Sequence, residues 1–330
     1  MQLPTPDDVL AARLRLAGHV VRTPMLRHPL LDERAGGPVL LKAEPLQRTG
    51  SFKLRGATNA VLQLGEAERR AGVVTYSSGN HGQAVACAAD AVGARATVVM
   101  PADAPRIKAE STARWGAEIV LYDRARDDRE AVAARIAERT GAVLVPPFDH
   151  PWVIAGQGTA ALELAEDAGA AGLRMDALLV CTGGGGLIGG SALAMDAVSP
   201  GTAVYAVEPE GWDDTGRSLR AGRRERAPGG SMLCDALLTP MPGALTFAVN
   251  QPRLAGGIAV SDAEVLAAMA FAFTYLKVVV EPGGAVCLAA LLSGRFRAEG
   301  RVVGATLSGG NVDPAVFARA LASDPRHVEA

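Results

Sequence analysis

Residues 177–196 read ALLVCTGGGGLIGGSALAMD, and they join a short apolar strand, a run of four glycines and an apolar helix. Glycine lets a backbone approach a ligand closely, and the free N–H groups at the start of a helix attract anions. A tight turn would account for one or two glycines but not for four. The run from Gly183 to Gly186 therefore predicts a phosphate-binding loop.

Strand and helix patterns alternate on both sides of this stretch. We expect further strands at 38–44, 72–77, 96–100, 118–122, 142–145, 203–208 and 302–307. We expect helices at 7–18, 52–64, 83–92, 107–115, 129–138, 159–167, 187–196, 262–277 and 285–292. Strands that alternate with helices of this length predict a parallel α/β architecture. A chain of 330 residues that is 49% hydrophobic can form two such domains or one large one.

The glycine run also permits a different class of protein. Gly184, Gly186 and Gly189 satisfy the GxGxxG pattern, and the next predicted strand ends in an acid, Glu208. Together these features are the fingerprint of dinucleotide binding, in which the acid binds a ribose. A dinucleotide-dependent oxidoreductase is therefore an alternative, although it leaves three other polar segments unexplained.

The first of these segments is TGSFKLRG, residues 49–56, which places Lys53 between Phe52 and Leu54. A lysine held in an apolar pocket has a lowered pKa and can form a Schiff base or accept a proton. A surface lysine on a helix would give the same eight residues. Only the rest of the chain can decide between the two interpretations.

The other two segments follow predicted strands. Residues 77–82, SSGNHG, combine hydroxyls, an amide and a helix start, which suits a small anion such as a carboxylate, although simple helix capping is the alternative. Residues 308–311, SGGN, follow the last predicted strand, at the edge of the sheet where ligands of open α/β proteins lie. Ser308 could there form one hydrogen bond with a ring nitrogen.

Residues 208–214, EPEGWDD, gather four carboxylates after a predicted strand. Carboxylate and carbonyl oxygens are the ligands that Mg²⁺ and Ca²⁺ prefer. A solvated acidic loop is the alternative interpretation.

Composition excludes several other classes. The net charge is -2 and the chain has no long basic run, which argues against nucleic acid as a partner. The four scattered cysteines, Cys87, Cys181, Cys234 and Cys287, show no metal-ligand spacing, so we expect reduced thiols and a cytoplasmic protein. We expect no membrane span and no signal peptide, because neither pattern is present.

Six segments, taken together and in order, resemble one family. The segments GSFKLRGATNA, SSGNHGQA, IAGQGTAALE, GGGGLIGG, VYAVEPEG and LSGGNVD are similar to those of fold-type II pyridoxal-phosphate enzymes, in the serine/threonine dehydratase and serine racemase branch. The resemblance extends from about residue 7 to residue 313. It implies the tryptophan synthase β-like fold, with two open twisted α/β domains and the cofactor in the cleft between them.

The resemblance also implies a role for each matched residue. Lys53 would hold pyridoxal phosphate as a Schiff base, with Phe52 against the ring, Asn80 on the ring hydroxyl and Ser308 facing the ring nitrogen. Backbone N–H groups of Gly183, Gly184, Gly185, Gly186 and Leu187 would bind the phosphate. Ser77, Ser78, Asn80 and His81 would receive the substrate carboxylate, and Ser78 matches the second acid/base of the racemases.

The acidic loop matches the divalent-cation site of the family, with Glu208, the carbonyl of Trp212 and Asp214 as ligands of Mg²⁺ or Ca²⁺. This match assigns Glu208 to a metal and not to a ribose. It favours the smaller, metal-dependent branch of the family.

The implied reaction is deamination by β-elimination. The cofactor makes the α-hydrogen of an amino acid acidic, Lys53 removes it, and a β-hydroxyl leaves. Hydrolysis then yields a 2-oxo acid and ammonia. Because Ser308 is neutral, the ring nitrogen should not stay protonated, which favours elimination over a long-lived carbanion.

Two departures from the family pattern limit the choice of substrate. Residues 234–242 read CDALLTPMP where many members have Asp-Gly-Val, and Thr239 stands where the racemases place a substrate-binding serine. Gly283 follows Glu281-Pro282 where the family usually has Ser, Thr or Ala. We expect L-serine or L-threonine by default, and racemase activity or a bulkier or acidic 3-hydroxy amino acid as alternatives.

The resemblance predicts a domain division and a homodimer. We expect a large cofactor-binding domain at 1–71 plus 151–330 and a small domain at 72–150 inserted in it. We expect no C-terminal regulatory domain, because the chain ends soon after Ser308. A binding protein that retained the cofactor but lost turnover would share all these motifs.

Overall fold

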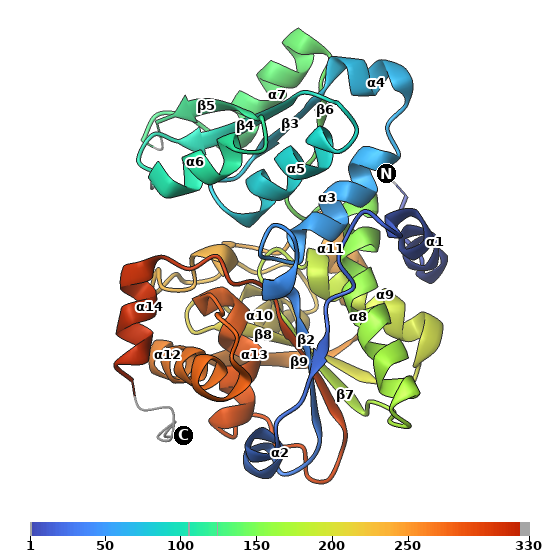
Figure 1. Cartoon of the computed structure of the whole chain (residues 1–330), viewed down its shortest axis with the longest axis vertical. Coiled ribbons are helices and arrows are strands. Elements are labelled where there is room, and N and C mark those ends of the chain that lie inside the picture. Colours follow the sequence, from blue (N-terminus) through green and yellow to red (C-terminus); the bar gives the residue numbers. More distant parts are fainter. Residues whose placement is uncertain (1, 105, 124, 324–330) are drawn as a thin grey trace.

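The computed structural model describes residues 2–104, 106–123 and 125–323, which fold around two separate β-sheets (Figure 1). The larger sheet has the spatial order β1 (Met25–Leu26), β2 (Val39–Ala43), β10 (Val303–Leu307), β7 (Ala177–Cys181), β8 (Ala203–Pro209) and β9 (Leu254–Val260). The smaller sheet has the order β5 (Glu118–Tyr122), β4 (Ala96–Pro101), β3 (Val73–Tyr76) and β6 (Val143–Leu144). All neighbouring strands are parallel except β1 and β2. The predicted parallel α/β architecture is confirmed.

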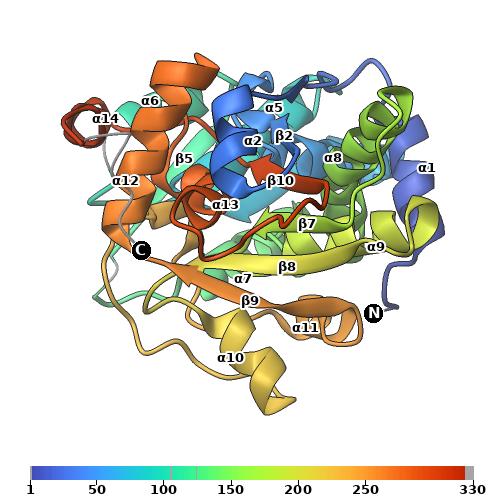
Figure 2. The same cartoon turned by 90° about the horizontal axis from the view of Figure 1, so that it is seen from below.

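Helices cover both faces of the larger sheet (Figure 2). One face carries α1 (Pro6–Leu16), α8 (Pro151–Ala170) and α9 (Gly186–Val198), and the other carries α2 (Pro29–Ala35), α12 (Asp262–Phe271) and α13 (Pro282–Leu292). Successive side chains of a strand point to opposite faces. Accordingly, Leu178 and Val180 of β7 belong to the first core and Leu179 and Cys181 to the second.

The smaller sheet is covered in the same way. Val73 and Val98 pack with α3 (Lys53–Leu62) and α5 (Asn80–Asp90), while Val74 and Val99 pack with α7 (Arg129–Thr140). The remaining helices are α4 (Glu66–Ala71), α6 (Arg106–Ala113), α10 (Asp214–Ala221), α11 (Ala244–Asn250) and α14 (Pro314–Leu321). All four strands of this sheet fall within residues 72–150, and the exact bounds of two domains stay a prediction.

A buried ionic cluster fixes α3 between β2 and α8. The fully buried guanidinium of Arg55 donates hydrogen bonds of 2.8–2.9 Å to Glu44 and Glu163, and the fully buried Lys42 donates one of 2.7 Å to Glu163. Buried charges are stable only when they are paired and hydrogen-bonded. Because Arg55 lies two residues after Lys53, this cluster also fixes where that lysine starts its helix.

Several elements differ from the sequence-based expectation. Helix α8 begins at Pro151, capped by His150, well before the expected residue 159, and α5 begins at Asn80 instead of 83. The expected helix at 262–277 ends at Phe271 and continues as a π-helical turn, Ala272–Leu276.

Strand β9 was not expected, because glycines interrupt its apolar pattern. A Cβ on Gly257 would lie 2.6 Å from the Cα of Gly216, so a glycine is needed where α10 crosses the strand. The short elements β1, α2, α4, α10, α11 and α14 were also not expected.

None of the described helices is both long and apolar enough to cross a bilayer. The four cysteines are buried and form no disulfide with one another.

Candidate active site

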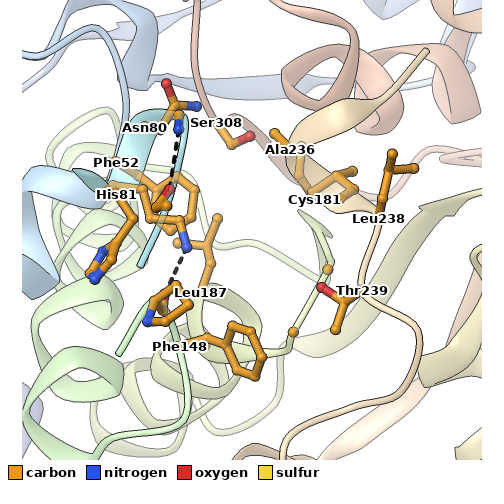
Figure 3. A pocket seen from close by; sticks show the side chains of 18 of the residues that line it. Phe52, Asn80, His81, Phe148, Cys181, Leu187, Ala236, Leu238, Thr239 and Ser308 are labelled. Atoms are coloured by element: carbon orange, nitrogen blue, oxygen red, sulfur yellow. Dashed lines mark hydrogen bonds between the residues drawn. The ribbon is translucent and has the colours of Figure 1, made fainter. Parts of the chain in front are cut away.

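One pocket brings together the segments that the sequence singled out (Figure 3). In the close-up, Phe52, Asn80 and His81 lie across the pocket from Cys181, Ala236 and Thr239. The pocket is lined by every residue predicted to bind cofactor or substrate, namely Phe52, Lys53, Ser77, Ser78, Asn80, His81, Gly183, Gly184, Gly185, Gly186, Leu187, Thr239 and Ser308. The predicted metal ligands Glu208, Trp212 and Asp214 are not in its lining.

Lys53 is the first residue of α3, and its environment favours the neutral amine. Its Nζ donates a 2.7 Å hydrogen bond to the carbonyl oxygen of Pro147 and lies 5.2 Å from the centre of the Phe52 ring. Burial lowers the pKa of Lys53 to about 8, and the nearby carboxylate of Glu281 opposes that shift. A lysine whose pKa is this close to neutrality can act as a nucleophile and as a base.

The glycine run forms a cradle between β7 and α9. A Cβ on Gly184 would lie 2.4 Å from the Phe148 ring, and Gly185 has a φ of 90°, so neither position tolerates a side chain. Thr246 and Asn250 donate hydrogen bonds to the carbonyl oxygens of Gly184 and Gly185 and so hold the loop in place. The first N–H groups of α9 have no partner within the helix, as at every helix start. This cradle fits a phosphate group.

The segment at residues 77–82 leads into α5: residues 77–79 precede the helix and residues 80–82 are its first residues. Gly79 caps the helix, so the backbone N–H groups of Asn80 and His81 lie in its first turn, where an anion is stabilised. The Ser77 hydroxyl accepts a 3.2 Å hydrogen bond from the N–H of Gly79, whereas Ser78 simply lines the pocket.

The His81 ring is buried and electrically neutral. Burial and the charge of Lys53 lower its pKa to about 3. Its Nε2 lies 3.0 Å from the carbonyl oxygen of Val145, an acceptor, so Nε2 carries the proton and Nδ1 does not. A carboxylate in the pocket can therefore be bound by the backbone N–H of His81 but not by its ring.

The side chain of Asn80 is fixed by two hydrogen bonds. Its Nδ2 donates to Glu281 and its Oδ1 accepts from Asn311, each over 2.7 Å. The Asn311 amide also donates to the carbonyl oxygen of Thr49. These hydrogen bonds thus join α5, the start of α13 and the segment after β10 around one side of the pocket.

Ser308 lies directly beside the start of the lysine helix. Its carbonyl oxygen accepts a 3.0 Å hydrogen bond from the N–H of Phe52. Thr239 lies on the facing segment, two residues after the short 3₁₀ turn Asp235–Leu237. A Cβ placed on Gly283 would lie 3.3 Å from Ala236 and 3.1 Å from Leu237 of that turn. The two departures from the family pattern, at residues 234–242 and at Gly283, are therefore neighbours in space.

Sequence reasoning gave no role to several residues of the pocket, among them Tyr76, Arg129, Phe148 and Glu281. Phe148 follows β6, and Tyr76 ends β3. Arg129 is exposed at the start of α7, with its guanidinium carbon 5.6 Å from the centre of the Tyr76 ring. From the sequence, Glu281 was named only to locate Gly283 and was given no role. Arg129 and Lys53 are the two lysine or arginine side chains among the described residues that line the pocket.

Two of the predicted metal ligands, Glu208 and Asp214, are buried outside the pocket lining. Glu208 is fully buried, and its oxygens accept hydrogen bonds of 2.8 and 2.9 Å from the N–H groups of Thr215 and Gly216. Asp214 is fully buried as well, and both its carboxylate oxygens lack a hydrogen-bond partner among the described residues.

Both carboxyl groups have a raised pKa. Burial raises the pKa of Glu208 to about 7, and burial together with Glu208 raises the pKa of Asp214 to about 9. Among the described residues no three acidic, histidine or cysteine side chains gather as metal ligands. Two carboxylates and the Trp212 carbonyl nevertheless fit a hard divalent cation, because it would satisfy the orphaned oxygens of Asp214.

Comparison with known proteins decides the family. A family model described as "Pyridoxal-phosphate dependent enzyme" matches residues 16–309. The chain belongs to the pyridoxal-phosphate-dependent enzymes. It is 42% identical to the serine racemase of Schizosaccharomyces pombe, with 97% of this chain and 98% of that protein covered. It is 44% identical to an L-threo-3-hydroxyaspartate ammonia-lyase of Pseudomonas sp, with 97% and 99% covered.

Solved structures agree with this result. The crystal structure of a threonine deaminase from T.th. superimposes with a TM-score of 0.87 and 45% identity, covering 94% of this chain and 99% of that one. The predicted fold type II of pyridoxal-phosphate enzymes is confirmed. The family match overturns the dinucleotide alternative, and Glu208, its proposed ribose ligand, lies outside the pocket of the glycine loop.

Proposed function

We propose that this pyridoxal-phosphate enzyme is an ammonia-lyase that deaminates an acidic 3-hydroxy amino acid, of the 3-hydroxyaspartate type, by β-elimination. The single observation that supports the acidic substrate is Arg129 in the pocket lining. The sequence-based default, L-serine or L-threonine, is not favoured, because relatives of similar identity carry different activities.

The residues of the pocket can hold the cofactor at both ends. The cradle of Gly183 to Gly186 fits the phosphate, and Lys53 can carry the aldehyde carbon. Ser308 and the fixed Asn80 side chain are the proposed partners of the ring nitrogen and ring hydroxyl. When bound, pyridoxal phosphate supplies an electron sink that makes the α-hydrogen of an amino acid acidic.

Lys53 is the proposed base of the reaction. With pyridoxal phosphate bound to the substrate, the free Lys53 amine would accept the α-proton. The pKa of about 8 means that a useful fraction is unprotonated near neutral pH. The β-hydroxyl then leaves, and hydrolysis of the product gives a 2-oxo acid and ammonia.

The two carboxylates of the proposed substrate would meet two different sites. The α-carboxylate suits the start of α5, where Ser78, Asn80 and His81 line the pocket. The second carboxylate suits the guanidinium of Arg129, since arginine forms strong charge-assisted hydrogen bonds with carboxylates. L-Serine and L-threonine lack this second group.

The test compares Arg129→Gln with Arg126→Gln, a control at an exposed arginine of the same loop. Loss of one charge-assisted hydrogen bond costs about 1.5–3 kcal/mol, so kcat/KM for L-threo-3-hydroxyaspartate should fall about tenfold to a hundredfold in R129Q. The value for L-serine should change less than threefold, and R126Q should match the parent enzyme. Equal losses on both substrates in R129Q would contradict the acidic preference.

Racemization is the second candidate, because Ser78 lines the pocket and a serine racemase is among the relatives. Ser78→Ala should then abolish formation of the D-enantiomer while 2-oxo acid formation continues. Chiral chromatography of the remaining amino acid distinguishes the two products.

The proposal includes a divalent cation held by Glu208, Asp214 and the Trp212 carbonyl. Its support is the pair of orphaned, buried oxygens of Asp214. Because the site lies outside the pocket lining, the cation would stabilise the fold and not take part in the chemistry. A homodimer in the cytoplasm is proposed from the resemblance alone.

A further inference from the structure

Two cysteine thiols contact each other at the edge of the pocket. Cys181 ends β7, Cys287 lies in α13, and their Sγ atoms are 3.5 Å apart. Both side chains are buried, with exposed fractions of 3% and 0%. A disulfide requires the two sulfur atoms to approach to about 2.05 Å, which is a movement of about 1.5 Å from this contact.

The two thiols differ in acidity. Burial alone would raise the pKa of Cys181, but hydrogen bonds with Cys287, Thr306 and Ser308 lower it to about 7. Burial raises the pKa of Cys287 well above its ordinary value. Cys181 is therefore the more acidic thiol of the pair, and the thiolate is the form that peroxides oxidise.

The two thiols also differ in access. Cys181 is part of the pocket lining, next to Thr182 and the glycine cradle, whereas Cys287 is not (Figure 3). A small oxidant that enters the pocket meets Cys181 first and finds Cys287 directly behind it. Cys234 is also buried, and the charge of Cys181 contributes to the rise of its pKa, so it is the competing partner.

We propose that Cys181 and Cys287 form an oxidative modification site, in which a peroxide converts the two thiols into a disulfide. In the first step the Cys181 thiolate attacks one peroxide oxygen, the O–O bond breaks, and Cys181 sulfenic acid and hydroxide form. In the second step the Cys287 sulfur attacks the Cys181 sulfur and the S–O bond breaks. The two thiols lose two electrons and two protons in total, and hydrogen peroxide becomes two water molecules.

The disulfide would act on the cofactor site through its position. Cys181 lies two residues before Gly183, and the carbonyl oxygen of Gly284, three residues after Glu281, is 3.6 Å from its sulfur. Drawing β7 and α13 together would displace the cradle and Glu281 relative to each other. We therefore expect weaker cofactor binding in the oxidised protein, and protection of Cys181 while the cofactor fills the pocket.

The experiment treats the full-length enzyme with hydrogen peroxide, once with the cofactor bound and once after its removal, and maps the thiols by mass spectrometry of unreduced peptides. The cofactor-free enzyme should yield a peptide pair linked through Cys181 and Cys287, lighter by two hydrogen atoms than the two thiol peptides. The cofactor-loaded enzyme should yield it at least tenfold more slowly. Buried Cys87, on α5, serves as the internal control and should stay reduced.

Two variants make the result unambiguous. Cys287→Ser should accumulate sulfenic acid at Cys181, detected with dimedone, and Cys181→Ser should leave Cys287 as a thiol. The oxidised protein should bind pyridoxal phosphate at least tenfold more weakly, and dithiothreitol should restore binding. A Cys181–Cys234 link, oxidation at Cys87 first, or persistence of both thiols under peroxide would overturn the proposal.

Discussion

Asn80 donates a 2.7 Å hydrogen bond to Glu281, which lies 201 positions further along the chain. The contact joins the start of α5 to the start of α13 across the pocket. Glu281 is buried and also faces Lys53, whose pKa its charge raises. The same carboxylate therefore fixes the proposed ligand of the cofactor ring and influences the proposed base.

Changing Glu281 to Gln and to Ala should separate these two effects. Glu281→Gln keeps a hydrogen-bond acceptor but removes the charge that raises the pKa of Lys53. Its pH profile of kcat should therefore shift toward lower pH, with a small change in cofactor affinity. Glu281→Ala also removes one of the two hydrogen bonds that fix Asn80, and the loss of a hydrogen bond to a charged group, about 1.5–3 kcal/mol, should weaken cofactor binding about tenfold or more.

Fluorescence titration with pyridoxal phosphate measures the affinity, and steady-state rates from pH 6 to 10 measure the profile. Identical profiles in E281Q and the parent enzyme would show that the charge does not reach Lys53.

Removing a cation from Glu208 and Asp214 should make stability depend on pH. The folded-state pKa values, about 7 and about 9, lie above the ordinary values of 4.5 and 3.8. Between these limits the folded protein binds more protons than the unfolded one, so stability falls as pH rises. Chelator-treated enzyme should thus lose Tm between pH 6 and 9, and Mg²⁺ or Ca²⁺ should restore it.

The matched controls are Asp214→Asn and Asp213→Asn. Asp213 pairs with Arg217 at 2.8 Å and is not one of the proposed ligands, so D213N should still respond to the cation. D214N should not respond. Differential scanning fluorimetry measures both, and an unchanged Tm after chelation at pH 8.5 would count against the metal site.

A side chain at Gly283 should move the segment that carries Thr239. A Cβ there would lie 3.1 Å from the Leu237 side chain and 3.3 Å from that of Ala236, closer than ordinary contacts. Overpacking of this kind costs about 1–3 kcal/mol when the neighbours cannot shift. Gly283→Thr should therefore change the ratio of kcat/KM between L-threo-3-hydroxyaspartate and L-serine. Gly169→Ala, where a Cβ meets no neighbour, should leave the ratio unchanged.

Arg55 should prove essential to the fold. It is fully buried and bonded to Glu44 and Glu163, so Arg55→Ala leaves two buried carboxylates with one cation, Lys42. Breaking such a buried pair costs about 3–5 kcal/mol. Calorimetry should show a large fall in Tm, whereas Arg70→Ala, at an exposed pair, should change it little. Equal Tm values would mean that the cluster does not anchor α3.

The sequence was sufficient to find the residues that we propose for the cofactor, because the segments that carry them are local patterns. A strand, a glycine run and a helix follow one another directly around Gly183, and Ser308 follows a strand in the same way. Arg129 could not be found in this manner, because α7 reaches the pocket only through the placement of the smaller sheet. The hydrogen bond between Asn80 and Glu281 likewise depends on chain segments that are distant in sequence.

The periodicity of apolar residues also failed to predict a strand where glycines take the place of larger side chains. Strand β9 contains Gly256 and Gly257, which erase the apolar pattern, and α10 approaches the strand at Gly257. The conclusion that the His81 ring cannot bind a carboxylate needed the position of the Val145 carbonyl, which no local motif encodes.

The most direct test is the production of 2-oxo acid and ammonia by the cofactor-loaded enzyme from L-threo-3-hydroxyaspartate, L-serine and L-threonine, with Lys53→Ala as the comparison. The account predicts turnover of all or some of these substrates, the highest kcat/KM for L-threo-3-hydroxyaspartate, and no turnover in K53A. Turnover by K53A at the parent rate would contradict the role of Lys53, and a higher kcat/KM for L-serine or L-threonine would contradict the acidic substrate.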